Sequence, residues 1–296
     1  MKPLATLVAA ILATAVPAMA QVRVVASTSS MAMLAREVGG QQVSITTLVP
    51  PDRDPHYLLA RPSMMVALRR ADLVVAVGAE LEVGWLPAAI QGASNPKLLP
   101  GQPGYFEGAA QIDLIESGQA ADRSRGDVHP MGNPHYYLDP VRMATVARAL
   151  AARLGTIDPA NKDAFAARAA AFSKAVDVRA EQWRKQAQGA PGVVFYHKDG
   201  NYLAAFLGVP VLGWLEPLPG IPPTASHLRG LVERLKGTKG IILYNSFHPK
   251  DGPEFLSRQL GWKAVQLQIE VPLDASGATY LLHIDQWVQA LIGAPS

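Results

Sequence analysis

Short apolar runs that alternate with helical patterns constrain the fold of this chain more than any other sequence feature. They form two series, with runs at 22–26, 43–49 and 73–77 in the first and at 193–196, 209–214, 241–244 and 264–267 in the second. Strands in alternation with helices are typical of a parallel sheet covered by helices. The sequence therefore predicts an α/β protein with two lobes, each built on a mainly parallel sheet flanked by helices.

A long helical pattern separates the two series. Asp158-Pro159 begins it, and apolar side chains recur near helical spacing as far as about Gln188. A helix of about thirty residues is about 45 Å long, enough to run along two adjacent domains. A shorter helix is expected before it, from Asp139-Pro140 to about Leu154, where Gly155 should end it. We expect an N-terminal lobe, a long linking helix and a C-terminal lobe at residues 21–157, 158–188 and 189–296.

The first twenty residues have the pattern of a secretory signal. Lys2 supplies a basic start, Leu4 to Ala15 is an apolar run, and Ala18-Met19-Ala20 is a small-x-small cleavage site. A membrane anchor is the alternative, but the run is too short for about 30 Å of hydrocarbon, and Pro17 interrupts its end. We therefore expect residues 1–20 to be removed as a signal peptide and the mature protein to be exported.

The composition excludes several kinds of site and partner. The 296 residues include no Cys, so a metal ion must be held by His, Asp, Glu or carbonyl oxygen. Lys and Arg number 27 against 24 Asp and Glu, and no long run of like charges marks a nucleic-acid surface. The His-Glu-x-x-His, Gly-x-Ser-x-Gly and phosphate-loop patterns are also absent. Nucleic acid is thus not expected as a partner, and these three enzyme signatures are missing.

Side chains that bind metals follow several of the predicted strands. His56, His197 and Glu270 each come after a strand, and His135 lies in the loop before the helix that starts at Asp139. Ligands of α/β sheets sit beyond the carboxyl ends of the strands, so the two lobes can bring these groups together in an interlobe cleft. Three imidazoles with one carboxylate suit Zn²⁺ well and Mn²⁺ tolerably. From spacing alone, a single His after a strand is more often a surface or loop-capping residue than a metal ligand.

Three motifs around these His residues resemble those of a known family. They are Asp54-Pro55-His56, Asn133-Pro134-His135-Tyr136-Tyr137-Leu138-Asp139-Pro140 and Phe195-Tyr196-His197-Lys198. In these motifs the chain is similar to the zinc and manganese ABC-transporter substrate-binding proteins, the ZnuA- and TroA-like group (cluster A-I). The resemblance extends over essentially the whole mature chain. It implies a periplasmic monomer that catalyses no reaction and delivers a divalent metal ion, zinc first and manganese second, to an ABC-type membrane permease.

Carried over residue by residue, the resemblance also implies a set of metal ligands. His56, His135 and His197 match the three His positions of the family. The family's fourth ligand is a carboxylate after a late strand, which Glu270 matches best, with Asp274 as runner-up. The resemblance therefore implies a site of three imidazoles and one carboxylate.

Other His residues leave alternatives open. His248 follows the strand at 241–244 and is either an accessory ligand or only a residue that introduces a helix. His129 is the single His before the second motif, where zinc-binding relatives often carry a long His-rich loop, so a metal-scavenging loop is mostly absent. His227 and His283 lie in predicted helices and are expected to be structural.

Two other functions fit the same residues. A metal-dependent hydrolase also uses three His ligands and an open position, but it needs a general base that the sequence does not single out. An exported adhesin or scaffold with a structural metal is the second alternative. Because no Cys follows the signal, we expect diffusion in a periplasm rather than lipid anchoring.

Overall fold

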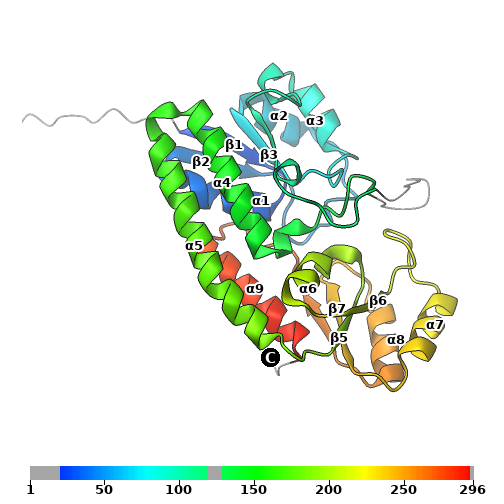
Figure 1. The fold of residues 1–296 in the computed structure, drawn as a ribbon. Coiled ribbons are helices and arrows are strands. Elements are labelled where there is room, and N and C mark those ends of the chain that lie inside the picture. The colour runs from blue at the N-terminus through cyan, green and yellow to red at the C-terminus, as the bar shows by residue number, and fades with distance from the viewer. Residues whose placement is uncertain (1–20, 119–128, 294–296) are drawn as a thin grey trace, which may run out of the picture.

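The computed structural model describes residues 21–118 and 129–293, so the predicted signal at 1–20 lies outside the described residues. Within them the chain forms two four-stranded sheets, with strand orders β2-β1-β3-β4 and β6-β5-β7-β8. Every strand pair is parallel. Figure 1 shows the two sheets in separate lobes with helices packed around them. The predicted α/β class with two parallel sheets is confirmed.

Seven of the eight strands in the described residues agree closely with the predicted apolar runs, and β4 is the one that no run predicted. The first sheet contains β1 (Val22–Ala26), β2 (Val43–Thr47), β3 (Leu73–Ala76) and β4 (Tyr105–Glu107). The second contains β5 (Gly192–Phe195), β6 (Val211–Trp214), β7 (Gly240–Asn245) and β8 (Ala264–Leu267). β1, β3, β5 and β7 occupy the central positions of their sheets, which explains their nearly continuous apolar sequence.

Nine α-helices connect and flank these strands in the described residues. They are α1 (Ser29–Gly39), α2 (Pro62–Arg70), α3 (Leu86–Ala93), α4 (Pro140–Ile157), α5 (Lys162–Gln186), α6 (Asn201–Leu207), α7 (Ala225–Leu235), α8 (Asp251–Leu260) and α9 (Gly277–Leu291). α4 begins where the sequence predicts, because the Asp139 side chain accepts hydrogen bonds from the first free amides of the helix. None of the described helices combines the length and apolar character needed to cross a membrane.

Two predicted helix boundaries were wrong. α4 continues through Gly155 to Ile157, because a glycine inside a helix costs only about 1 kcal/mol and packing against α5 outweighs that cost. A Cβ at Gly155 would lie 2.8 Å from the Lys162 side chain, so glycine also permits the close turn between the two helices. α5 begins at Lys162 rather than Asp158, since residues 159–161 form a separate 3₁₀ turn.

The hydrophobic core is continuous between the lobes. α5 has 25 residues, about 38 Å, and runs alongside both lobes with α4 and α9 beside it (Figure 1). One cluster of buried side chains includes residues of α1, α4, α5 and α9 together with both sheets. Arg36 also donates to the carbonyls of Leu273 and Ala275, at 2.9 and 2.7 Å. The long helix is therefore one of several connections between the lobes. Because one sheet precedes α5 in the sequence and the other follows it, we propose 21–157 and 189–296 as the lobe limits.

The continuous core predicts that the two lobes unfold together. Trp287 is 1% exposed, and its indole N–H donates to the Gln268 carbonyl at 2.9 Å. Trp287→Ala should lower the free energy of unfolding by about 3–5 kcal/mol while keeping a single transition in urea. Leu59 is 79% exposed, so Leu59→Ala should change the same quantity by less than about 0.5 kcal/mol. Two separate transitions, with only one of them moved by Trp287→Ala, would contradict this expectation.

Candidate metal centre

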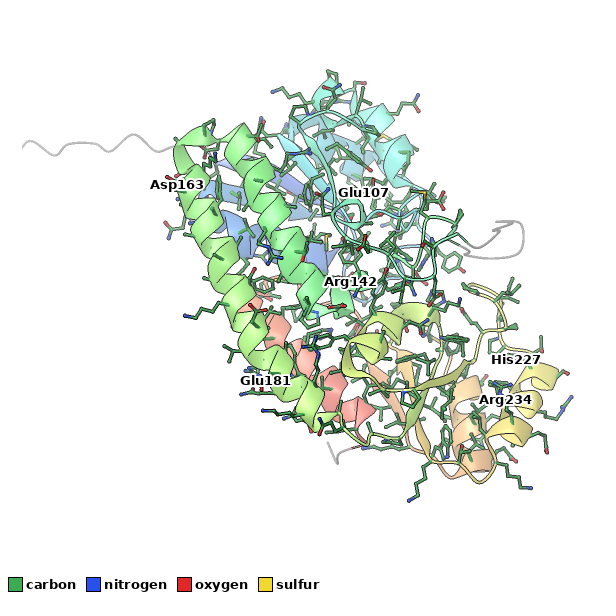
Figure 2. The ribbon with its side chains drawn as sticks, in the orientation of Figure 1. Glu107, Arg142, Asp163, Glu181, His227 and Arg234 are labelled. Carbon is green, nitrogen blue, oxygen red and sulfur yellow. The ribbon has the colours of Figure 1, made fainter. Side chains whose placement is uncertain are left out.

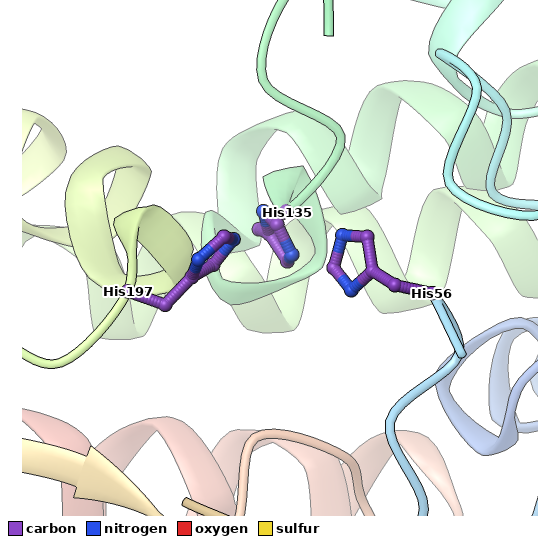
Figure 3. Close-up of side chains that lie close together, drawn as sticks. All are labelled: His56, His135 and His197. Carbon is purple, nitrogen blue, oxygen red and sulfur yellow. The ribbon is translucent and has the colours of Figure 1, made fainter. Parts of the chain in front are cut away.

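Three imidazoles from distant parts of the sequence meet between the lobes. His56 lies in the loop after β2, His135 in the loop before α4, and His197 two residues beyond β5. One ligand nitrogen from each ring lies within 4.8 Å of those of the other two, and the ring centroids are 5.0 to 5.5 Å apart. Figure 3 shows the rings converging on a common point. The structure thus brings together the three His residues predicted as ligands.

The loops that carry His56 and His135 share one construction. In each, an Asx residue two positions earlier accepts from the backbone N–H and lies against Nδ1 of the ring. The Oδ1–Nδ1 distances are 2.6 Å for Asp54 and 2.9 Å for Asn133. The Pro between Asx and His fixes one backbone angle and removes a donor, which stiffens the turn. The Asx-Pro-His sequence therefore orients its own imidazole.

A tryptophan holds the first of these loops against the N-terminal lobe. The Trp85 side chain is fully buried, and its indole N–H donates to the Pro55 carbonyl at 2.8 Å. This bond fixes the residue that directly precedes His56. The position of His56 thus depends on the turn before α3 as well as on its own loop.

The third imidazole is oriented by a distant residue. Glu216, in the loop after β6, places Oε2 2.7 Å from Nδ1 of His197. With an oxygen acceptor beside Nδ1 in all three rings, the proton lies on Nδ1 and the lone pair lies on Nε2, where a metal can bind. In His56 this nitrogen lies 3.2 Å from Nε2 of His129, which a metal ion would displace. The arrangement can therefore present three neutral imidazole nitrogens to one divalent ion.

Burial and neighbouring charges shift the pKa values around the cluster. Burial tends to raise the pKa of Asp54, but hydrogen bonds from His56 outweigh it and hold the pKa at about 2. Burial followed by the neighbouring imidazoles lowers the pKa of His135 well below its usual value. Burial also opposes the charge on His197, but Glu216 more than compensates, so the pKa of His197 is raised. Of these two imidazoles, His197 is the more readily protonated.

Both lobes line the pocket that holds the three rings. Its volume is about 420 Å³, and its walls include Tyr137 of the N-terminal lobe and Phe247 and Ile269 of the C-terminal lobe. Asp199 also faces it and accepts a hydrogen bond from the Asn245 amide. Burial raises the pKa of Asp199 to about 7. No sequence signal pointed to Asp199, because its partner Asn245 is 46 residues further along the chain and meets it only in the folded protein.

Glu270 is close to this pocket but is engaged elsewhere. Its Oε2 accepts from the Ser29 hydroxyl at 2.9 Å and from the Ser30 N–H at 2.7 Å, at the N-terminus of α1. Its Oε1 is buried without a hydrogen-bond partner, and burial raises the pKa of the carboxyl group. Its oxygens are not part of the group of atoms that lie within 4.8 Å of one another. Asp274, the runner-up, is exposed and does not line the pocket.

His248 and His129 lie beside the three-His cluster. His248 stacks on Tyr196, and its Nδ1 accepts from the Asn245 N–H at 3.1 Å, so the proton of the neutral ring is on Nε2. Burial lowers the pKa of His248 to about 3, so the ring is neutral. Its Nε2–H can then only donate a hydrogen bond. His129 places Nε2 3.2 Å from Nε2 of His56.

The two His residues expected to be structural have structural contacts. His227 lies on α7 (Figure 2) and does not line the pocket, and its Nε2 lies 2.9 Å from the Trp214 carbonyl. His283 is buried in α9, and its Nε2 lies 3.2 Å from the Ile269 carbonyl. Neither residue belongs to the group of converging nitrogens in the described residues.

Two parallel α/β lobes that enclose a cluster of metal-binding side chains define a class of transport substrate-binding proteins. The chain belongs to the family described as zinc-uptake complex component A, periplasmic, whose family model matches residues 24–294. Members of this family are substrate-binding proteins of ABC transporters, so the chain is not an enzyme. The hydrolase alternative raised by the sequence is therefore wrong, and the predicted family is confirmed.

Individual relatives agree with this assignment. The high-affinity zinc uptake system protein ZnuA of Yersinia pestis is 26% identical over 289 residues, which cover 92% of this chain and 89% of the relative. The manganese ABC transporter substrate-binding lipoprotein PsaA of Streptococcus anginosus is 23% identical over 240 residues, covering 79% and 74%. The structure of FpvC from Pseudomonas aeruginosa in complex with Mn²⁺ superposes with a TM-score of 0.77 at 24% identity, covering 92% and 98%. This structural likeness supports the fold.

The raised pKa of His197 predicts how metal affinity depends on pH. A protonated imidazole cannot bind a metal, so affinity should be constant at high pH and fall once the pH drops through the pKa of His197. Because that pKa is raised above 6.5, the loss should begin above pH 6.5 and reach about tenfold per pH unit for this single proton. Competition titrations with Zn²⁺ from about pH 8 to about pH 5 measure it. An affinity that stays constant over that whole range would contradict the prediction.

Proposed function

We propose that this protein captures Zn²⁺ in the pocket between its lobes and delivers the ion to an ABC-type membrane permease. The observation that carries the proposal is the set of three converging imidazoles, each with an oxygen acceptor beside Nδ1. Zn²⁺ is commonly bound by several His side chains through one ring nitrogen, with the other nitrogen hydrogen-bonded to a carboxylate or carbonyl group. His56, His135 and His197 are accordingly the proposed ligands.

The donor set favours zinc over manganese. Imidazole nitrogen binds Zn²⁺ more tightly than Mn²⁺, which prefers carboxylate and carbonyl oxygen. The carboxylates of Asp54 and Glu216 lie one hydrogen bond beyond the imidazoles and balance part of the charge of a divalent ion. The names of the relatives include both zinc and manganese, so the choice of zinc rests on the chemistry of this pocket.

Glu270 is the proposed fourth ligand. Its Oε1 is buried without a hydrogen-bond partner, the preceding residue Ile269 lines the pocket, and a metal ion would supply the missing positive partner. To bind the ion, the carboxylate must move from the N-terminus of α1, where Ser29 and Ser30 hold its other oxygen. His248 is not chosen, because its Nδ1 already accepts a hydrogen bond and its Nε2 carries the proton.

The proposed location is the periplasm. Residues 1–20 have the basic start, apolar run and small-x-small site of a signal peptide, and we propose that cleavage leaves Gln21 as the first residue. The family description also names a periplasmic component, whereas several relatives are named as lipoproteins. A freely diffusing periplasmic protein can carry its ion across that compartment to the permease.

Ligand substitutions test the proposal directly. His56→Ala, His135→Ala and His197→Ala should each lower zinc affinity at least about tenfold, because each removes one nitrogen ligand. Isothermal titration calorimetry of the mature protein should give one Zn²⁺ per chain, and competition should show weaker binding of Mn²⁺. His227→Ala is the matched control and should leave zinc affinity unchanged, since His227 lies on α7 away from the pocket.

Three results would count against the proposal. Absence of zinc binding at about pH 7.5 would refute it. Equal losses in His227→Ala and the three ligand variants would point to a general loss of stability. Competition by Mn²⁺ on equal terms with Zn²⁺ would contradict a nitrogen-dominated site.

The fourth ligand has its own test. Glu270→Ala should weaken zinc binding, whereas Asp274→Ala, which removes an exposed carboxylate four residues later, should not. Glu270→Gln is also informative, because it keeps an oxygen near Ser29 and Ser30 but removes the charge that a metal ion attracts. Zinc affinities by competition with a chromogenic chelator are the measurement. Unchanged affinity in Glu270→Ala with a large loss in His248→Ala would show that His248 is the fourth ligand.

A further inference from the structure

The three imidazoles differ in what holds them. His56 and His135 are oriented by Asp54 and Asn133, which belong to the same short loops. His197 has no such neighbour and depends on Glu216, which is 19 residues further along the chain. Of the three rings, His197 is therefore tied to a separate segment of the C-terminal lobe.

The same carboxylate oxygen also holds that segment in place. Oε2 of Glu216 accepts from the Gly220 N–H at 2.9 Å as well as from His197. The Glu216 side chain is 12% exposed. The backbone N–H of Glu216 donates to the Tyr196 carbonyl at 3.1 Å. Gly220 has a φ of +77°, and both it and Pro222 line the pocket. Residues 216–222, which we call the 216–222 loop, thus form part of the pocket wall. Their turn is closed by the hydrogen bond from the Gly220 N–H to the Glu216 carboxylate.

We propose that Glu216 is a positioning residue that couples metal occupancy at His197 to the conformation of the 216–222 loop. This inference rests on the proposed function of the pocket. A metal on Nε2 draws electron density from the ring, which makes Nδ1–H a stronger donor to Glu216. The carboxylate is then held more firmly and keeps its bond to the Gly220 N–H. Coupling of this kind is reciprocal: the factor by which metal binding favours the ordered loop equals the factor by which the ordered loop increases metal affinity.

The coupling gives the metal-loaded protein a surface that differs from that of the empty protein. The loop lies at the wall of the pocket, while the Asx-Pro-His turns of His56 and His135 keep their oxygen acceptors within their own loops. A change at His197 is therefore passed to residues 216–222, and a change at His56 is not. The 216–222 loop is the part of the C-terminal lobe where the loaded and empty forms should differ.

Hydrogen exchange on the mature protein tests this coupling. In the wild-type protein, saturating Zn²⁺ should slow exchange of the Gly220 amide by about tenfold, measured in a peptide that spans residues 215–224. Glu216→Ala should abolish the zinc-dependent slowing, because no acceptor remains. Glu216→Gln should retain it, since the amide oxygen can take the place of Oε2, although loss of the charge weakens zinc binding.

Asp54→Ala is the matched control. It removes the equivalent acceptor from His56 and should lower zinc affinity by about 10- to 100-fold, as should Glu216→Ala. At saturating Zn²⁺ it should nevertheless keep the slow exchange at Gly220, because the acceptor for that amide is Glu216. Slowing in Glu216→Ala equal to that in wild type, or its loss in Asp54→Ala, would overturn the coupling.

A second readout needs no variant. Zinc should shift the Gly220 amide resonance of the ¹⁵N-labelled wild-type protein and leave that of Gly237, in the turn after α7, in place. If zinc binds and neither the exchange nor the resonance of Gly220 changes, the coupling is wrong while the proposed function stands. If the wild-type protein binds no zinc, the proposed function fails, and the coupling fails with it.

Discussion

The proposed metal centre depends on the hydrogen bond that each imidazole makes through Nδ1. An oxygen acceptor at that atom fixes both the tautomer and the ring plane, and it leaves the Nε2 lone pair directed into the pocket. Asp54, Asn133 and Glu216 provide the three acceptors. Without them a buried imidazole would be free to rotate, and ordering three rings around an ion would reduce the affinity.

The rest of the fold keeps these three loops at a fixed separation. The three proposed ligands come from segments that are far apart in the sequence and belong to different lobes, so no local motif can set their distances. The continuous core along α4, α5 and α9 does so, helped by the hydrogen bonds of Arg36 across the lobes. Because a shared core and these hydrogen bonds join the lobes, a large hinge motion would have to break them.

The sequence was informative wherever local chemistry decides the structure. Alternating apolar runs predicted the strands, and Asp139-Pro140 predicted the start of α4. Gly155 misled the prediction, since the packing of α4 against α5 outweighs the local preference of a glycine. The role of Glu216 could not be predicted, because its contact with His197 exists only when two loops of the folded lobe meet. A repeated Asx-Pro-His was visible in the sequence and is the signal that identifies Asp54 and Asn133.

The position of Glu270 has a consequence for metal release. Its carboxylate interacts with the N-terminus of α1, where two hydrogen bonds and the helix dipole stabilise a negative charge. If Glu270 binds the ion, as proposed, these interactions are lost when the metal is captured and recovered when it leaves. They therefore oppose binding and lower the affinity below that of a site with a preformed carboxylate ligand. A transport protein must release its ion as well as bind it, and a carboxylate with an alternative partner lowers the barrier to that release.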